Sequence, residues 1–229
     1  MILLAVLLPA ASVARAAQAT PAVTVQSLAG HYQGTATSPR GTVQVIAHPK
    51  LEVVLPNFPA DGLILDIGGG GEGVIGQLKG RQVVAIDLSK QELDEAPGTP
   101  LLKIVMDARD LRFTDAAFPT ATVFFTFMYI DPADHEKVFR EIYRVLQPGG
   151  RLLVWDPVFP TRQDPAQANI LFPLRVKLPA KEINTGYGVR FREGQGAEHF
   201  VALAGKTGFE VVSRRDEAGW FFLELTKGR

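Results

Sequence analysis

The sequence contains no cysteine, which excludes disulfide bonds, thiol catalysis and thiolate metal ligands. Its four histidines, at positions 31, 48, 135 and 199, are scattered and lack the spacing of a metal site. Lysine plus arginine and aspartate plus glutamate number 24 each, so no excess of basic charge attracts nucleic acid. These absences predict a protein without a metal ion or a nucleic-acid partner, which acts on a small molecule.

The sequence also lacks a segment long enough to span a membrane. The apolar N-terminus, residues 1–16, contains a run of only about thirteen residues. It ends in Ala14-Arg15-Ala16, a small-x-small arrangement like that of a signal-peptidase site. We expect a signal peptide, cleaved after Ala16 or Ala19, and a periplasmic or secreted protein. An uncleaved apolar extension is the alternative, and it would indicate a cytoplasmic protein.

Glycine, by contrast, is concentrated in residues 63–73, LILDIGGGGEG. An apolar run followed at once by glycines predicts a buried strand that ends in a tight turn, where backbone amides approach a ligand closely. Residues 73–79 can then form a short helix. The pattern Gly68-x-Gly70-x-x-Gly73 also fits the dinucleotide fingerprint, so the glycines alone leave the nucleotide open.

Three successive predicted strands end in a carboxylate. These residues are Asp66, Asp87 and Asp107, after the apolar runs 63–65, 83–86 and 101–106. Because the carboxyl ends of parallel strands meet at one edge of a sheet, we expect the three side chains along a ligand-binding edge. Asp87 lies 17 residues beyond Gly70, close to the spacing at which an acidic residue binds a ribose hydroxyl.

The remaining elements complete an α/β pattern. Strands are predicted at 122–130 and 151–155, with a helix between them that begins at Asp131 and Pro132. A helix at 198–206 precedes two strands, 209–212 and 220–225, which should pair antiparallel. The sequence thus predicts a doubly wound, mostly parallel seven-stranded sheet with a C-terminal antiparallel strand pair.

Three boundaries divide the chain in this interpretation. Residues 17–47 are rich in Thr, Gly, Ser and Pro and are expected to be a loosely ordered extension, with one strand at 42–46. The α/β domain then occupies residues 48–229. Within it, residues 157–193 carry five prolines and break the regular pattern, so they are expected to be a substrate-covering insertion.

Residues from about 48 to 226 resemble the Rossmann-like, class I S-adenosylmethionine-dependent methyltransferases of the small-molecule type 11 branch. Four motifs carry the resemblance: LILDIGGGG, VVAIDLS, IVMDARDLRF and EIYRVLQPGGRLLVWDP. The last two are far more specific than the glycines. The resemblance implies a methyltransferase that uses S-adenosylmethionine and a small-molecule acceptor.

The same resemblance implies a set of cofactor-binding residues along the sheet edge: Asp66, Gly68, Gly70, Asp87, Leu88, Asp107 and Ala108. Asp66 and the two glycines would line the methionine end of the cofactor. Asp87 would hold the ribose hydroxyls, and Leu88 would contact the adenine face. Asp107 and the Ala108 amide would read the adenine amino edge.

The sequence departs from the family pattern at two points. Glu72 stands where the family usually has a third glycine, which puts the shape of the cofactor pocket in question. Pro119 follows Phe118 where the family often has an aspartate, so a common supporting carboxylate is missing.

Candidates for a catalytic base or a substrate contact are Tyr129, His135 and Asp156. Each also has an ordinary structural explanation: a core aromatic, a solvated helix residue and a loop cap. Two other functions stay open, a nicotinamide-dependent oxidoreductase and a non-catalytic S-adenosylmethionine-binding protein of the same fold.

Overall fold

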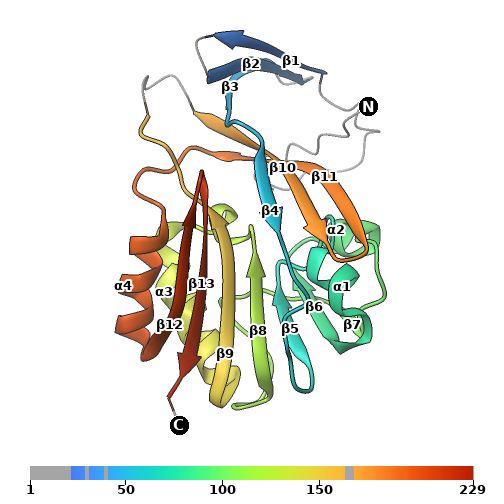
Figure 1. The fold of residues 1–229 in the computed structure, drawn as a ribbon, viewed down its shortest axis with the longest axis vertical. Helices are drawn as coiled ribbons and strands as arrows, with labels where there is room; N and C mark the ends of the chain where they lie inside the picture. Colours follow the sequence, from blue (N-terminus) through green and yellow to red (C-terminus); the bar gives the residue numbers. More distant parts are fainter. Residues whose placement is uncertain (1–21, 29–30, 39–40, 163–167, 229) are drawn as a thin grey trace. The chain divides into compact units, whose positions relative to one another are not determined.

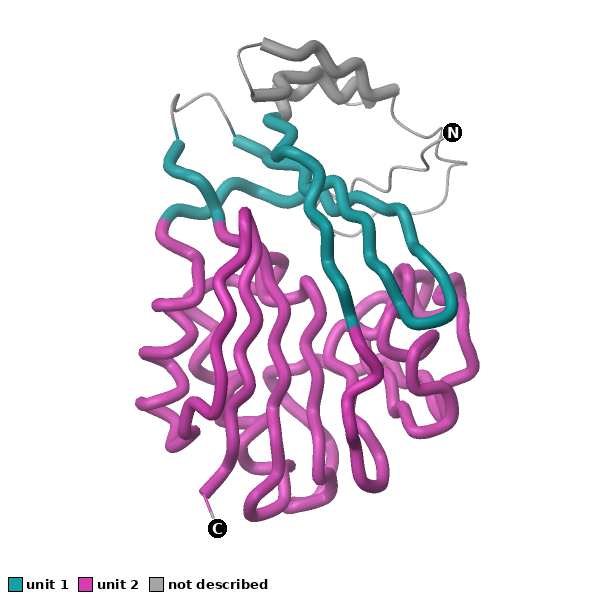
Figure 2. The backbone as a smooth tube through the Cα atoms, in the orientation of Figure 1, with its two compact units in different colours: residues 1–55, 159–193 teal, residues 56–158, 194–229 magenta. Residues whose placement is uncertain are grey.

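The computed structural model describes residues 22–28, 31–38, 41–162 and 168–228 (Figure 1). The predicted signal peptide and its cleavage positions lie outside these residues. The chain forms two compact units, coloured separately in Figure 2. One unit comprises residues 1–55 and 159–193, and the other comprises 56–158 and 194–229. None of the helices in the described part of the chain is long and apolar enough to cross a membrane.

The unit of residues 56–158 and 194–229 contains the predicted α/β pattern. Its strands are β5 (Ile64–Ile67), β6 (Val83–Asp87), β7 (Leu102–Val105), β8 (Phe118–Phe124), β9 (Leu146–Pro157), β12 (Phe209–Glu217) and β13 (Trp220–Lys227). Its α-helices are α1 (Val74–Lys79), α2 (Lys90–Glu95), α3 (Pro132–Val145) and α4 (Ala197–Thr207). Two short 3-10 helices, η1 (Gly80–Gln82) and η2 (Phe127–Tyr129), lie between them.

These seven strands form one sheet in the order β12-β13-β9-β8-β5-β6-β7, and Figure 1 shows them side by side. The five strands β5 to β9 pair parallel with one another, whereas β13 pairs antiparallel with both β9 and β12. The predicted fold class is therefore confirmed. The carboxyl ends of the five parallel strands share one edge, as predicted from the positions of the three aspartates.

Helix α3 begins as its sequence predicted. The Asp131 carboxylate accepts a hydrogen bond from the Ala133 amide at 3.0 Å, and Pro132 occupies the first turn. Its apolar stripe enters the main core of this unit, which helix α4 and the sheet complete. Buried Val138 and Ile142 are members of that stripe.

The predicted strand at 122–130 differs from the structure. Strand β8 begins earlier, at Phe118, and ends at Phe124; residues 127–129 form the 3-10 helix η2. Phe125, with a φ of 49°, turns the chain out of the strand. The apolar run continues because both segments are buried, so hydrophobicity alone could not locate the turn.

Pro119 lies inside β8, a central strand, where a proline removes one hydrogen-bond donor. The pairing of β8 with β9 shifts register between Phe118 and Thr120, which accommodates this residue. Pro119 is near the amino end of the strand. It therefore lies at the edge of the sheet opposite the three aspartates. An aspartate at this position, as in the family pattern, would not lie near them.

The other unit is a β-sheet of six strands. They are β1 (Ala22–Leu28), β2 (His31–Ser38), β3 (Gly41–Ala47), β4 (Leu51–Val54), β10 (Asn169–Leu178) and β11 (Lys181–Arg190). The order is β1-β2-β3-β10-β11, with β4 also paired to β10. The expectation of a loosely ordered 17–47 segment differs from this structure, which has strands at 22–28, 31–38 and 41–47. The irregular part of 157–193 likewise contains a regular antiparallel hairpin, β10–β11.

Candidate active site

The glycine loop after β5 depends on the absence of side chains. Gly68 has a φ of 73°, and a Cβ atom there would lie 2.3 Å from the Thr126 hydroxyl oxygen. A Cβ at Gly70 would lie 2.7 Å from a carboxylate oxygen of Asp87. The amides of Gly68 and Gly69 donate to the Ile86 carbonyl at 2.8 and 2.9 Å, which ties the loop to β6. The loop is thus packed against both neighbouring strand ends.

Asp87, at the end of β6, links the glycine loop to helix α2. Its Oδ2 accepts from the Gly70 amide at 3.3 Å, and its Oδ1 accepts from the Ser89 amide at 2.8 Å. Ser89 in turn caps α2, because its hydroxyl accepts from the Glu92 amide at 3.2 Å. The carboxylate is only partly buried, so part of it can face a ligand.

Asp66 lies inside the protein, 2% exposed, at the other side of the loop. The Thr122 hydroxyl donates to its Oδ1 at 2.8 Å. Burial raises the pKa of Asp66 to about 7, and the negative charge of Asp87 contributes in the same direction, while the bond from Thr122 opposes both. Asp66 therefore changes charge near neutral pH.

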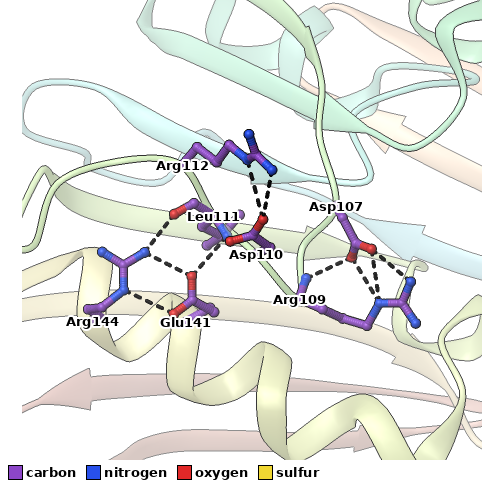
Figure 3. A network of polar contacts seen from close by, with 7 residues as sticks. All are labelled: Asp107, Arg109, Asp110, Leu111, Arg112, Glu141 and Arg144. Atoms are coloured by element: carbon purple, nitrogen blue, oxygen red, sulfur yellow. Dashed lines mark hydrogen bonds and ion pairs between the residues drawn. The ribbon is translucent and has the colours of Figure 1, made fainter.

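Asp107 follows β7 and is engaged by a neighbouring arginine (Figure 3). The Arg109 guanidinium donates to both carboxylate oxygens, and its terminal nitrogen lies 2.7 Å from Oδ2. This hydrogen bonding is the main cause that lowers the pKa of Asp107. A second terminal nitrogen of Arg109 donates to Asp134, in the first turn of α3, at 2.8 Å. The sequence reasoning did not anticipate this ion pair.

Tyr129 ends the 3-10 helix η2 and is 37% exposed. Its hydroxyl pKa is raised, first by burial and then by the negative charges of four carboxylates: Glu72, Glu92, Asp156 and Asp87. The exposed part of the residue limits this effect through solvent. The phenol nonetheless stays protonated at neutral pH and acts as a hydrogen-bond donor.

Asp156 is fully buried near the end of β9 and fastens η2. Its Oδ2 accepts from the Phe127 amide at 2.9 Å, and the nearby amides of Thr126 and Met128 also lower its pKa. Burial raises the pKa of Asp156 well above its usual value, and these amides oppose the increase. The side-chain amide of Gln195 also lowers this pKa, although it makes no hydrogen bond to the carboxylate.

His135 is buried on α3 and holds the same segment from its other side. Its Nε2 lies 3.1 Å from the carbonyl oxygens of both Phe127 and Ile130. Since carbonyl oxygens only accept, Nε2 carries a proton, and Nδ1 is hydrogen-bonded with His199 Nε2 at 2.9 Å. Both ring nitrogens of His135 are therefore engaged within the protein.

Thr126 connects this segment to the glycine loop, and it was missed in the sequence. Its hydroxyl lies 3.2 Å from the Ile67 carbonyl, and its side chain occupies the space beside Gly68. Nothing in the local sequence marks a threonine within an apolar run as a loop contact. Glu92, in the first turn of α2, has a pKa that is raised by burial and then by Asp87, which places it in the same acidic environment.

The other predicted cofactor residues are also found at this edge. Leu88 is 66% exposed directly after Asp87, and Ala108 is half-buried directly after Asp107. The structure thus gathers acidic residues around the glycine loop: Asp66, Glu72, Asp87 and Glu92. Such an environment suits a cation and repels a diphosphate group. Among the described residues, no three histidine or acidic side chains are grouped to hold a metal ion.

Comparison with solved structures defines the class of this fold. An S-adenosylmethionine-dependent methyltransferase from Methanosarcina mazei aligns with 75% of this chain and 95% of its own length, with a TM-score of 0.53 and 21% identity. This likeness establishes the class I methyltransferase fold.

Sequence comparison gives partial matches. Residues 65–154 match the model described as a methyltransferase domain. The demethylmenaquinone methyltransferase of Thermus thermophilus is 41% identical over 81 residues, which are 33% of this chain and 36% of that protein. The ubiquinone/menaquinone biosynthesis C-methyltransferase UbiE of Desulfotalea psychrophila is 34% identical over 124 residues, 50% of this chain and 47% of that protein. The chain thus spans about half, or less, of the length of these curated relatives.

The chain carries a methyltransferase domain of the S-adenosylmethionine-dependent family, as its motifs predicted. S-adenosylmethionine is the methyl donor of this family.

Proposed function

We propose that this protein transfers a methyl group from S-adenosylmethionine to a ring carbon of a small quinone-type acceptor. The methyltransferase domain supports the reaction class. The names of the two curated relatives, which specify demethylmenaquinone and carbon methylation, support the acceptor.

The position of Asp87 carries the cofactor part of this proposal. Its carboxylate is held by the amides of Gly70 and Ser89 at the end of β6, where two ribose hydroxyls can donate to its remaining lone pairs. The glycine loop packs closely against Asp87 and Thr126, and the carboxylates of Asp87 and Glu92 beside it favour a positive charge. Bound there, the cofactor would supply a methyl group on a sulfonium, whose sulfur leaves as a neutral thioether.

Tyr129 is the proposed contact to the acceptor. Its raised pKa makes the phenol a donor that orients an acceptor oxygen and a poor base. Asp156 and His135, by contrast, are proposed as positioning residues. They bind amides and carbonyls of the segment that carries Tyr129, and so fix its phenol relative to the glycine loop.

The segment 157–193 is proposed to select the acceptor. It begins directly after Asp156, at the carboxyl end of β9, and the chain returns to this unit at Gly194. Loops that follow the carboxyl ends of parallel strands commonly carry substrate contacts.

The test is methyl transfer by the full chain, with S-adenosylmethionine labelled in its methyl group. The acceptors are a reduced demethylated quinone, a phenol and a primary amine. We expect label on a ring carbon of the quinone, with loss of one ring proton, and a lower rate in Tyr129→Phe. Label on nitrogen or on the phenol oxygen would refute the acceptor class. Tight cofactor binding without any transfer would favour a non-catalytic binding protein.

A further inference from the structure

The ion pair between Asp107 and Arg109 occupies the carboxylate that the resemblance assigns to the adenine amino group (Figure 3). Oδ1 accepts from the Arg109 backbone amide at 2.8 Å and from its Nε at 3.0 Å. Oδ2 accepts from Nε at 3.0 Å and from a terminal nitrogen at 2.7 Å. These contacts come from three N–H donors, because Nε shares its one hydrogen between the two oxygens, and they take up most of the about four lone-pair positions of the carboxylate.

Arg109 is held at its far end as well. Its other terminal nitrogen donates to Asp134 Oδ2 at 2.8 Å, in the first turn of α3. The guanidinium thus bridges the loop after β7 and the start of α3. The amino group of adenine can only donate to Asp107. It therefore competes with Arg109 for the lone pairs of this carboxylate.

We propose that Arg109 competes with the cofactor's adenine for Asp107 and thereby sets the protein's affinity and selectivity for the 6-amino group. This inference rests on the proposed cofactor site. Binding of adenine releases at least one of the Arg109 contacts, and the guanidinium keeps Asp134 as a partner. Arg109 is therefore a specificity-determining residue. It lowers the affinity for the cofactor, and in the free protein it links the loop after β7 to the start of α3.

The competition is modest, because the ion pair is partly open to solvent. The side chains of Arg109 and Asp107 are 43% and 32% exposed, and exposed pairs contribute little to stability. Removal of the guanidinium should therefore improve binding of an adenine ligand by about two- to fivefold.

The chain offers a matched control three residues further on. Arg112 pairs with Asp110 at the same sequence spacing, through contacts of 3.2 and 3.3 Å, and its side chain is 80% exposed (Figure 3). Asp110 is not among the residues expected at the cofactor. Arg112→Gln removes the same charge and the same kind of pair without freeing Asp107.

The experiment is calorimetric titration of the full-chain protein with S-adenosylhomocysteine, whose neutral sulfur avoids a change in repulsion between sulfonium and arginine. A second ligand is the analogue in which hydrogen replaces the 6-amino group. We expect Arg109→Gln to bind S-adenosylhomocysteine about two- to fivefold tighter than the wild type, with no gain for the analogue. Arg112→Gln should match the wild type, and Asp134→Asn should show no gain, because it weakens the partner that the guanidinium keeps when adenine binds.

Three results would overturn the inference. They are unchanged affinity in Arg109→Gln, weaker affinity, or an equal gain for both ligands, which would reflect charge alone. Absence of wild-type binding to S-adenosylhomocysteine is a different failure, because it would refute the proposed cofactor site and this inference with it.

Discussion

The buried carboxylate Asp66 should contribute strongly to the pH dependence of stability. Its pKa in the folded protein is about 7, whereas its ordinary value is 3.8. Between these values the folded state binds more protons than the unfolded chain does. The free energy of unfolding must therefore fall as the pH rises through this window.

The magnitude follows from the two pKa values. A difference from 3.8 to about 7 corresponds to ~4 kcal/mol of lost stability in total, once the pH exceeds both values. Of this loss, ~2.5 kcal/mol falls between about pH 5 and about pH 8. Asp66→Asn abolishes the titration and keeps an oxygen that can accept from Thr122.

The assay is urea denaturation of wild type and Asp66→Asn at both pH values. The variant should gain stability relative to the wild type as the pH rises, by ~2.5 kcal/mol. Asp156 also has a raised pKa, but its contribution is common to both proteins and cancels in the difference. Asp61→Asn, at an exposed position, is the control and should show no such trend. A difference between Asp66→Asn and wild type that stays constant with pH would refute the reasoning.

Two further substitutions test the loop and the segment packed against it. Gly68→Ala should destabilise the protein by about 2–4 kcal/mol in urea titrations, because its Cβ would overlap the Thr126 side chain at a positive φ. Gly205→Ala, within α4 and with nothing near its Cβ position, should instead stabilise it by about 0.5–1 kcal/mol; equal effects of the two would contradict the packing described. His135→Leu should lower kcat about tenfold or more with cofactor affinity nearly unchanged, and His135→Gln, which restores a donor near Nε2, should recover part of the rate. If cofactor affinity fell in parallel with kcat in His135→Leu, the positioning role would be wrong.

Local patterns were sufficient for the elements that position the cofactor residues. The buried strands before Asp66 and Asp87, the glycine turn between them and the capped starts of α2 and α3 each have a short-range cause in the sequence. These causes are strand burial, a turn that excludes side chains, and side-chain caps. Together these local patterns were enough to predict the fold class.

The turn at η2 has no such local cause. The run TVFFTFMYI contains no glycine or proline, and it leaves the strand because distant side chains bind its backbone. The Asp156 carboxylate takes the Phe127 amide, and the His135 ring takes the Phe127 and Ile130 carbonyls. Such contacts join residues 5 to 29 positions apart along the chain and cannot be read from periodicity.

The second sheet was missed for a related reason. Five prolines suggested irregular structure in 157–193, yet only Pro173 lies inside a strand of the hairpin, and Pro179 belongs to its turn. Strand β10 pairs parallel with β3 and β4, which are far away in the sequence, so this pairing could not be read from local patterns. Its role in selecting the acceptor stays a prediction.

The most direct test of the account is calorimetric titration of S-adenosylmethionine into the wild-type protein and Asp87→Ala. We predict one binding site per chain and a loss of about 2–3 kcal/mol in the variant, because it removes a charged acceptor of two hydroxyl hydrogen bonds. The control is Asp94→Ala, an exposed position on α2, which should bind as the wild type does. Equal affinities of wild type and Asp87→Ala, or tighter binding of a nicotinamide dinucleotide than of S-adenosylmethionine, would contradict the central claim.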